Sequence, residues 1–204
     1  MRIYLLRHGQ SQWQVSDTTD LDSSLTELGR KQSHLLANRL YQYGLHRDLV
    51  FSSPLKRAQE SVAFLSKDMK TRVRILTDLQ EAPFKVASYL PQAEHPLYKP
   101  AFPELSHEYT LFKAQVRRAF TQLVHVSEEH RRVIAMTHGG VIKTILRLIL
   151  GNDSICFEIN NASLTLLEWR DGIWRLLLLN CQEHLPEDLR CSSVHKKILG
   201  FHNG

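Results

Sequence analysis

Two short apolar runs in this sequence each lead into a histidine that is followed by glycine. Residues 3–6 precede Arg7 and His8, and residues 133–136 precede, after one threonine, His138. Continuous apolar runs of this length are typical of strands that are buried on both faces of a parallel sheet. In such a sheet, ligand sites collect beyond the carboxyl ends of the strands. Two histidines 130 positions apart can therefore meet in one crevice with an arginine, an arrangement suited to a phosphoryl group.

Strand and helix patterns alternate along the rest of the chain. The apolar runs predict strands at residues 2–6, 49–52, 72–76 and 132–136. Helical spacing predicts helices at 27 to about 43, from 54 onward, at 106–129 and at 141–150. Near the end, a hairpin around Asp171-Gly172 is expected to join strands at 163–169 and 174–180. This order predicts an α/β fold, a three-layer α/β/α sandwich with a mostly parallel central sheet.

Capping residues mark several of the expected helix ends. Thr26 is placed to cap the first helix, which is expected to end at Gly44. Ser53 and Pro54 are placed as the cap and first position of the second helix, and Gly151 marks the end of the last. The apolar faces of the first and third helices are predicted to consist of Leu28, Leu35, Leu36 and Leu40, and of Leu111, Phe112, Val116, Ala119, Phe120, Leu123 and Val124.

Length and proline distribution define the expected domain organisation. The chain has 204 residues, of which 43% are hydrophobic, enough for one large domain. We expect this domain to cover residues 1–185, with a proline-rich lid insertion at about 82–105 and a tail at 186–204. Five of the seven prolines lie between Pro83 and Pro103, which excludes a regular helix or central strand there. The aromatic side chains of this insertion either cover a substrate or pin the loop to the core: Phe84, Tyr89, Tyr98 and Phe102.

The formal charge is +5, from 26 basic and 21 acidic residues. The basic residues are scattered, so we expect an ordinary basic surface and no nucleic-acid partner; the alternative is that the positive charge attracts an anionic substrate. Three widely spaced cysteines favour a reducing compartment. The first strand begins directly after Met1, and the apolar residues 141–150 contain Lys143 and Arg147 and are too short to span a bilayer. We therefore expect a cytoplasmic protein without a signal peptide or membrane partner; the oligomeric state stays open.

Four motifs in this order resemble the histidine phosphatase superfamily, also called phosphoglycerate mutase-like. They are Leu6-Arg7-His8-Gly9-Gln10-Ser11, Leu25-Thr26-Glu27-Leu28-Gly29-Arg30-Lys31-Gln32, Ser52-Ser53-Pro54-Leu55-Lys56-Arg57-Ala58 and Thr137-His138-Gly139-Gly140. The end of the domain is also similar to the family, through Asn161-Ala162-Ser163, Asn180 and His184-Leu185. Together these markers span residues 1 to about 185.

The resemblance implies that His8 is the nucleophile and that Arg7, Arg57 and His138 hold the non-bridging phosphoryl oxygens. A neutral imidazole attacks phosphorus without charge repulsion, and its ordinary pKa of about 6.5 leaves much of it neutral at physiological pH. Arginine matches two oxygens at once, and His138 is expected to contribute most when protonated. The resemblance also implies, from its position, that Glu81 is the general acid, a role that requires a raised pKa.

Further phosphate contacts are implied for Ser11, Gln14 and Gly139. Many members have asparagine where this chain has Gln14, which weakens that contact. The residues after Glu81 also depart from the mutases, which leaves the substrate open. No metal-ligand spacing is present, and we expect neither a metal nor another cofactor.

The sequence favours a phosphatase that hydrolyses a small phosphorylated metabolite, releasing inorganic phosphate, through a phosphohistidine intermediate on His8. A cofactor-dependent phosphoglycerate mutase is an alternative, but it needs a second anion clamp, and residues 83–103 offer only Lys85 and Lys99. A protein phosphohistidine phosphatase and a non-catalytic phosphate-binding module are the other two alternatives.

Overall fold

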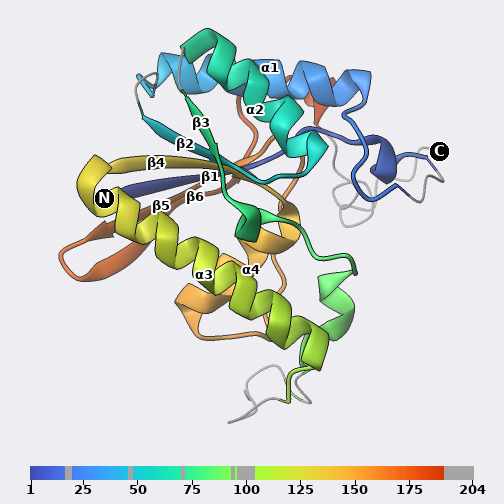
Figure 1. Cartoon of the computed structure of the whole chain (residues 1–204), viewed down its shortest axis with the longest axis vertical. Coiled ribbons are helices and arrows are strands. Elements are labelled where there is room, and N and C mark those ends of the chain that lie inside the picture. The colour runs from blue at the N-terminus through green and yellow to red at the C-terminus, as the bar shows by residue number, and fades with distance from the viewer. Residues whose placement is uncertain (17–19, 46–47, 70–71, 93–94, 96–103, 191–204) are drawn as a thin grey trace.

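A six-stranded sheet forms the centre of the molecule in the computed structural model (Figure 1). The structure describes residues 1–16, 20–45, 48–69, 72–92, 95 and 104–190. The strand order is β3-β2-β4-β1-β5-β6. The strands are β1 (Arg2–Arg7), β2 (Leu49–Ser52), β3 (Val73–Ile75), β4 (Arg132–Thr137), β5 (Leu164–Arg170) and β6 (Ile173–Cys181).

Four strands of the sheet are parallel to one another. β4 pairs in parallel with β1 on one side and with β2 on the other, and β2 pairs in parallel with β3. β5 and β6 add an antiparallel hairpin next to β1. Its turn places Asp171 and Gly172 at φ of 56° and 73°, the left-handed conformation that a tight hairpin turn requires. The predicted mostly parallel sheet and its hairpin are confirmed.

Helices cover both faces of the sheet, as Figure 1 shows. α1 (Glu27–Gln42) and α2 (Lys56–Met69) lie together on one face, and α3 (His107–His130) and α4 (Gly139–Leu150) lie on the other. The Thr26 side chain accepts a hydrogen bond from Gly29 N and caps α1, as predicted. The predicted ends also hold, since Gly44 and Gly151 both adopt positive φ. The three-layer α/β/α sandwich is therefore confirmed.

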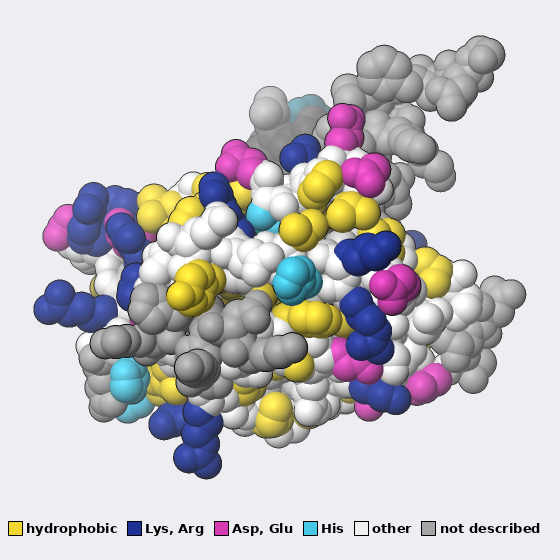
Figure 2. Space-filling model, turned by 90° about the horizontal axis from the view of Figure 1, so that it is seen from above, with side chains coloured by type: hydrophobic (Ala, Val, Ile, Leu, Met, Phe, Trp, Pro, Cys, Tyr) yellow, Lys and Arg dark blue, Asp and Glu magenta, His cyan; other side chains and the backbone are white. Residues whose placement is uncertain are grey.

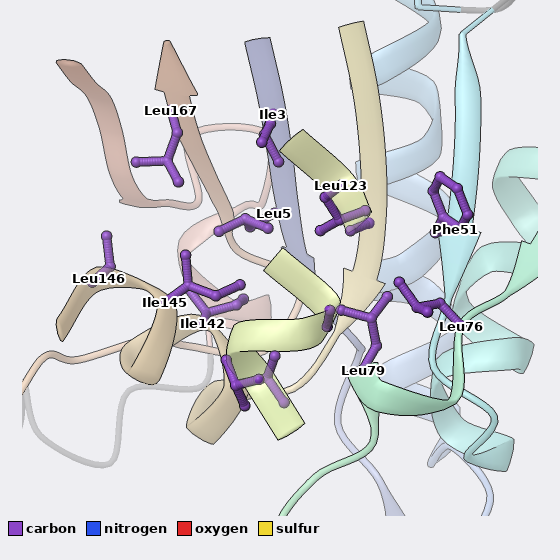
Figure 3. Packing of buried hydrophobic residues seen from close by; sticks show 14 of the residues in the cluster. Ile3, Leu5, Phe51, Leu76, Leu79, Leu123, Ile142, Ile145, Leu146 and Leu167 are labelled. Atoms are coloured by element: carbon purple, nitrogen blue, oxygen red, sulfur yellow. The ribbon is translucent and has the colours of Figure 1, made fainter. Parts of the chain in front are cut away.

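Alternation along the central strands divides the core into two clusters. Ile3 and Leu5 of β1 point toward α3 and α4, whereas Tyr4 and Leu6 pack on the side of α1 and α2. Figure 3 shows the first cluster, in which side chains from the sheet meet Leu123 of α3 and the apolar face of α4. Both faces of β1 and β4 are thus buried, which keeps the two histidine-bearing strand ends fixed.

Three details of the predicted helices are corrected by the structure. α2 begins at Lys56, so Ser53 and Pro54 precede the helix and do not form its cap and first position. α4 begins at Gly139, two residues earlier than expected. On α3, Leu111 is 58% exposed although it was expected on the apolar face, and Tyr109 is buried instead. The other members of that face are at least half-buried.

The proline-rich insertion and the tail are described only in part. Val86–Tyr89 form a short 3-10 helix, and Phe84 packs against both Tyr89 and Phe112 of α3. Phe84 therefore pins the loop to the core; Tyr98 and Phe102 lie outside the described residues. Of the predicted tail, Glu187–Leu189 form another 3-10 helix.

The surface carries both signs of charge. Figure 2 views the molecule from the side of α1 and α2, and on this face Lys and Arg side chains lie at several separate places with Asp and Glu between them. This agrees with the scattered basic residues of the sequence. Within the described part of the chain, no helix is both long and apolar enough to cross a membrane.

Candidate active site

Backbone hydrogen bonds at the carboxyl end of β4 bring the site together. His8 N donates to Thr137 O at 3.1 Å, and Ser53 N donates to Met136 O at 2.9 Å. The residues that follow β1 and β2 therefore flank the end of β4, where His138 occupies the position before the first residue of α4. The rings of His8 and His138 lie 5.0 Å apart between centroids, as the two strand ends predicted.

The contacts of His8 define the state of its ring. Its Nδ1 lies 2.6 Å from Gly9 O, and a carbonyl oxygen only accepts hydrogen bonds. The neutral ring therefore carries its proton on Nδ1 and keeps a lone pair on Nε2. Arg57 Nε donates to this Nε2 at 3.2 Å. The nitrogen suited to nucleophilic attack thus lies beside a guanidinium group, with the ring buried.

His138 is completely buried and is held by a serine. Its Nε2 lies 2.8 Å from Ser53 Oγ, which also accepts a hydrogen bond from Leu55 N at 3.2 Å. Its other nitrogen, Nδ1, is buried without a hydrogen-bond partner among the described residues. A buried polar atom of this kind, beside His8, is available to an incoming ligand.

The surroundings of His8 and His138 favour the neutral form of both imidazoles. Burial, followed by the charges of Arg7 and Arg57, holds the pKa of His8 well below its ordinary value. Burial, then His8 and the same arginines, also lowers the pKa of His138 well below its ordinary value. The low pKa disfavours the protonated form in which His138 was expected to contribute most. Until an anion neutralises the arginines, His138 is a neutral donor.

Both arginines are tied to backbone carbonyl groups. Arg7 Nη1 donates to Ile159 O at 2.5 Å, and Arg57 Nη1 donates to Leu21 O at 2.5 Å. Burial lowers the pKa of Arg57, while Glu81 raises it. These anchors hold two guanidinium groups around His8, so the structure brings together Arg7, His8, Arg57 and His138 as predicted.

Glu81 reaches the site from the segment after β3. Thr137 Oγ1 donates to Leu79 O at 2.8 Å, which fastens this segment to the end of β4. The Glu81 carboxylate accepts hydrogen bonds from Gly140 N at 2.9 Å and Ala82 N at 3.1 Å. Burial nevertheless raises the pKa of Glu81, because desolvation outweighs these bonds and the two arginines. A carboxyl group with a raised pKa beside two cations is suited to proton donation.

Gly140 is required for this approach of Glu81. A Cβ atom at Gly140 would lie 2.2 Å from Glu81 Oε1, far inside contact distance. At Gly139, by contrast, a Cβ atom would lie 3.5 Å from Arg7 Nε, an ordinary contact. Gly139 starts α4 next to Arg7, so its position fits the predicted phosphate contact.

Ser11 and Gln14 form a small network beside the site. Ser11 is buried, and its backbone N and Oγ both bond to Gln14 Oε1. The amide groups of Gln14 and Asn161 bond to each other in both directions at 3.0 Å, and Asn161 Nδ2 also donates to His8 O at 3.2 Å. The longer stem of glutamine is thus used to reach Asn161. The phosphate contacts of Ser11 and Gln14 stay predictions.

Two residues of the site had not been assigned a role from the sequence. Ser53 was interpreted as a helix cap, since it precedes proline, and Asn161 was noted only as part of the family's ending. The available signal for Ser53 was its place directly after a buried strand, which it shares with His8 and His138. Within the described ranges, no three side chains of the His, Cys, Asp and Glu types converge as a metal site requires.

Comparison with known proteins agrees with this geometry. The model of the histidine phosphatase superfamily (branch 1) matches residues 3–182. The mitochondrial serine/threonine-protein phosphatase PGAM5 of Rattus norvegicus is 32% identical over 171 residues, which cover 75% of this chain and 56% of that protein. The metal-independent phosphoserine phosphatase of Arabidopsis thaliana is 29% identical over 193 residues, covering 84% of this chain and 78% of that protein. The chain spans only 56% to 63% of the length of the first PGAM5 relatives.

Solved structures show the same fold. Mycobacterial glucosyl-3-phosphoglycerate phosphatase superimposes with a TM-score of 0.66 at 27% identity, covering 88% of this chain and 98% of that one. Phosphoserine phosphatase from Entamoeba histolytica, in complex with 3-phosphoglyceric acid, gives a TM-score of 0.69 at 21% identity, covering 91% and 99%. The mycobacterial structure is similar to this chain in sequence and in fold, whereas the Entamoeba histolytica structure shows similarity in fold.

Proposed function

The chain belongs to the histidine phosphatase superfamily, and on this basis we propose that it is a phosphatase that hydrolyses a small phosphomonoester through a phosphohistidine intermediate on His8. One observation carries the proposal. The bond from His8 Nδ1 to Gly9 O leaves the Nε2 lone pair beside the Arg57 guanidinium and the His138 ring. A nucleophile that is neutral and already oriented needs no deprotonation before it attacks phosphorus.

The first step transfers the phosphoryl group to the enzyme. The Nε2 lone pair of His8 forms a bond to phosphorus while the bond from phosphorus to the ester oxygen breaks. Glu81, whose raised pKa favours the protonated form, gives its proton to that oxygen, and the alcohol leaves. Arg7, Arg57 and His138 stabilise the negative charge on the equatorial oxygens of the phosphoryl group in the transition state.

The second step returns the enzyme to its starting state. Glu81 is now a carboxylate and takes a proton from a water molecule, whose oxygen attacks phosphorus as the bond to His8 Nε2 breaks. Inorganic phosphate leaves, His8 regains its lone pair, and Glu81 is protonated again. Each group is thus restored without a metal ion or redox step in the proposed cycle.

The relatives support a phosphorylated hydroxyl compound as substrate. Relatives at 27% to 32% identity are named as a phosphoserine phosphatase, a glucosyl-3-phosphoglycerate phosphatase and a serine/threonine-protein phosphatase. Among these, we propose that the substrate is a small phosphorylated metabolite. A panel that contains free phosphoserine, phosphoglycerates, sugar phosphates and a phosphoseryl peptide, with phosphate release as readout, tests this. Faster turnover of the peptide than of every small ester contradicts it.

The nucleophile is tested with two histidine variants. His8→Ala is expected to lower phosphate release by at least about a thousandfold, because no other group replaces the attacking nitrogen. His125→Ala, on the exposed face of α3, is the matched control and is expected to keep full activity. Brief incubation with a ³²P-labelled ester should label wild type and the control at histidine, with a base-stable, acid-labile bond. Unchanged turnover or labelling in folded His8→Ala contradicts the proposal.

A further inference from the structure

Ser53 is placed by the end of β2 directly against His138. It is completely buried, and its Oγ lies 2.8 Å from His138 Nε2. We propose that Ser53 is a positioning residue that selects the tautomer of His138: its hydroxyl donates to Nε2, which keeps the ring proton on Nδ1, where it is donated to a phosphoryl oxygen. The role in turnover rests on the function proposed above, whereas the tautomer does not.

The direction of the hydrogen bond follows from the partners of Ser53. A serine hydroxyl has one proton to donate and two lone pairs to accept with. One lone pair of Ser53 Oγ accepts from Leu55 N. The remaining contact of this Oγ in the described chain is His138 Nε2. If Nε2 carried the ring proton and donated it, the buried serine proton would have no acceptor there, which costs about 1–3 kcal/mol.

The same reasoning assigns the other ring nitrogen. A neutral imidazole carries one proton, so Nε2 as acceptor means that Nδ1 is the donor. Nδ1 is buried and has no hydrogen-bond partner among the residues described. The ring lies 5.0 Å from that of His8, the group proposed to receive the phosphoryl group. An unused buried donor at this place fits an oxygen of that group.

A neutral donor is what the surrounding charges demand. His138 faces His8 and the guanidinium groups of Arg7 and Arg57, while Glu81 lies at Gly140 on the same helix end. The positive charges of Arg7 and Arg57 oppose protonation of the His138 ring. With the opposite tautomer, a lone pair on Nδ1 would face the phosphoryl oxygen and repel it. Ser53 therefore lets His138 act without acquiring a charge.

The two histidines then share one tautomer but play opposite roles. In His8 the Nδ1 proton is bound to Gly9 O, which exposes the Nε2 lone pair. In His138 the Nε2 lone pair is bound by Ser53, which exposes the Nδ1 proton. One ring is thereby arranged as nucleophile and the other as donor, and each by a single hydrogen bond.

The tautomer is measured directly in the unliganded protein. Long-range ¹H–¹⁵N correlation spectra of ¹⁵N-histidine-labelled protein distinguish protonated from unprotonated ring nitrogens, and His138→Asn assigns the signals. We expect His138 to show protonated Nδ1 and unprotonated Nε2 in wild type. Ser53→Ala should lose this pattern, with mixed or Nε2-protonated signals. A wild-type proton on Nε2, or an unchanged His138 pattern in Ser53→Ala, overturns the proposal.

Matched variants separate the role from general damage. Ser52→Ala removes the neighbouring buried serine, whose hydroxyl donates to Ser53 O, and should leave the His138 pattern unchanged. Ser53→Cys keeps a side chain of similar size with a weaker donor, and should give an intermediate pattern even if the alanine variant folds poorly.

Turnover supplies the second readout. Ser53→Ala is expected to lower kcat by about ten- to a hundredfold with little change in KM, and Ser53→Cys by less, because the donor aids the transition state. A changed tautomer with unchanged kcat overturns the catalytic part of the proposal. If wild type hydrolyses no ester at all, the proposed function fails, while the spectra still decide the tautomer.

Discussion

At the scale of single residues, the proposed chemistry depends on opposite shifts of two groups. Burial and two arginines keep the pKa of His8 low, and burial keeps the pKa of Glu81 high. His8 must be neutral to attack, so activity falls when the pH drops through its lowered pKa. Glu81 must be protonated to donate, so activity falls when the pH rises through its raised pKa. We expect a bell-shaped profile of kcat/KM, with the acid limb below the ordinary histidine range.

The profile must be corrected for the ionisation of the substrate, because phosphate monoesters have a second pKa of about 6. Glu81→Gln should remove the alkaline limb and leave the acid limb in place. An acid limb at the ordinary histidine pKa would show that His8 is not desolvated as the structure has it.

Gly140 offers a second residue-scale prediction. Gly140→Ala places a methyl group 2.2 Å from the former position of Glu81 Oε1, and the carboxylate must move away. Hydrolysis of alkyl phosphates should fall by about a hundredfold, because a poor leaving group needs the acid. Aryl phosphates, which leave more easily, should be affected much less.

The matched variant is Gly139→Ala, whose methyl group meets Arg7 at an ordinary contact distance. It should keep the wild-type ratio of alkyl to aryl hydrolysis. Equal losses on both ester types in Gly140→Ala would remove Glu81 from proton donation. Circular dichroism of both variants checks that the fold is retained.

The sequence was most informative where chemistry follows directly from a strand. Arg7, His8 and His138 continue apolar runs, and parallel strands end at one edge, so their meeting was predictable. Ser53 was not assigned to the site, because a serine before proline satisfies a local rule for helix caps equally well. Its real partner is 85 positions away, and only the register of β2 against β4 brings them together.

At the scale of elements, one close crossing of two backbone segments holds the first turn of α1 against the loop that carries His8. A Cβ atom at Gly29, in the first turn of α1, would lie 2.0 Å from Gln10 O, and one at Gly9 would lie 2.2 Å from Gly29 O. Around it, Gly9 N donates to Ser61 Oγ of α2, and Ser33 of α1 bonds the same oxygen. The loop that carries His8 is thereby held by both helices of this layer.

Gly29→Ala is expected to destabilise the protein although alanine is the better helix former. Because backbone atoms cannot yield as a side-chain end can, we expect a loss of about 2–3 kcal/mol in the free energy of unfolding. Urea denaturation measures it. Lys31→Ala, exposed on the same helix, should change stability by less than about 0.5 kcal/mol. Equal stability of Gly29→Ala and wild type would contradict the crossing.

Element types were predictable from periodicity, whereas some boundaries were not. The Ser53–His138 bond and the bond from Leu55 N hold the residues after β2 in a turn, so α2 starts only at Lys56. On α3, spacing alone placed Leu111 inside. The structure buries Tyr109 in that turn, with its hydroxyl donating to Asp153 at 2.8 Å. Such a polar anchor has no signature in an apolar pattern.

At the scale of the whole molecule, three neutral imidazoles tie stability to pH. Burial of His184, which bonds to Ala162 O at 3.0 Å, lowers its pKa to about 4, and burial also lowers the pKa of His8 and His138. In the unfolded chain, each of these rings binds a proton as the pH falls below about 6.5, whereas in the folded protein it does not. Stability is therefore full above that pH and is lost as the pH falls toward 4. Glu81 opposes this, because its raised pKa lets the folded state take up a proton first.

His184 allows this effect to be tested away from the chemistry. Between pH 6 and 5, each neutral histidine contributes a slope of about 1.4 kcal/mol per pH unit to the free energy of unfolding. Urea unfolding of His184→Asn should show a slope smaller by about that amount than wild type, at some cost in stability at pH 7. His125→Asn, exposed on α3, should keep the wild-type slope. If His184→Asn also keeps the wild-type slope, His184 is already protonated in the folded protein. The segment that supports residues 160–162 behind His8 would then be more open to water than in the structure.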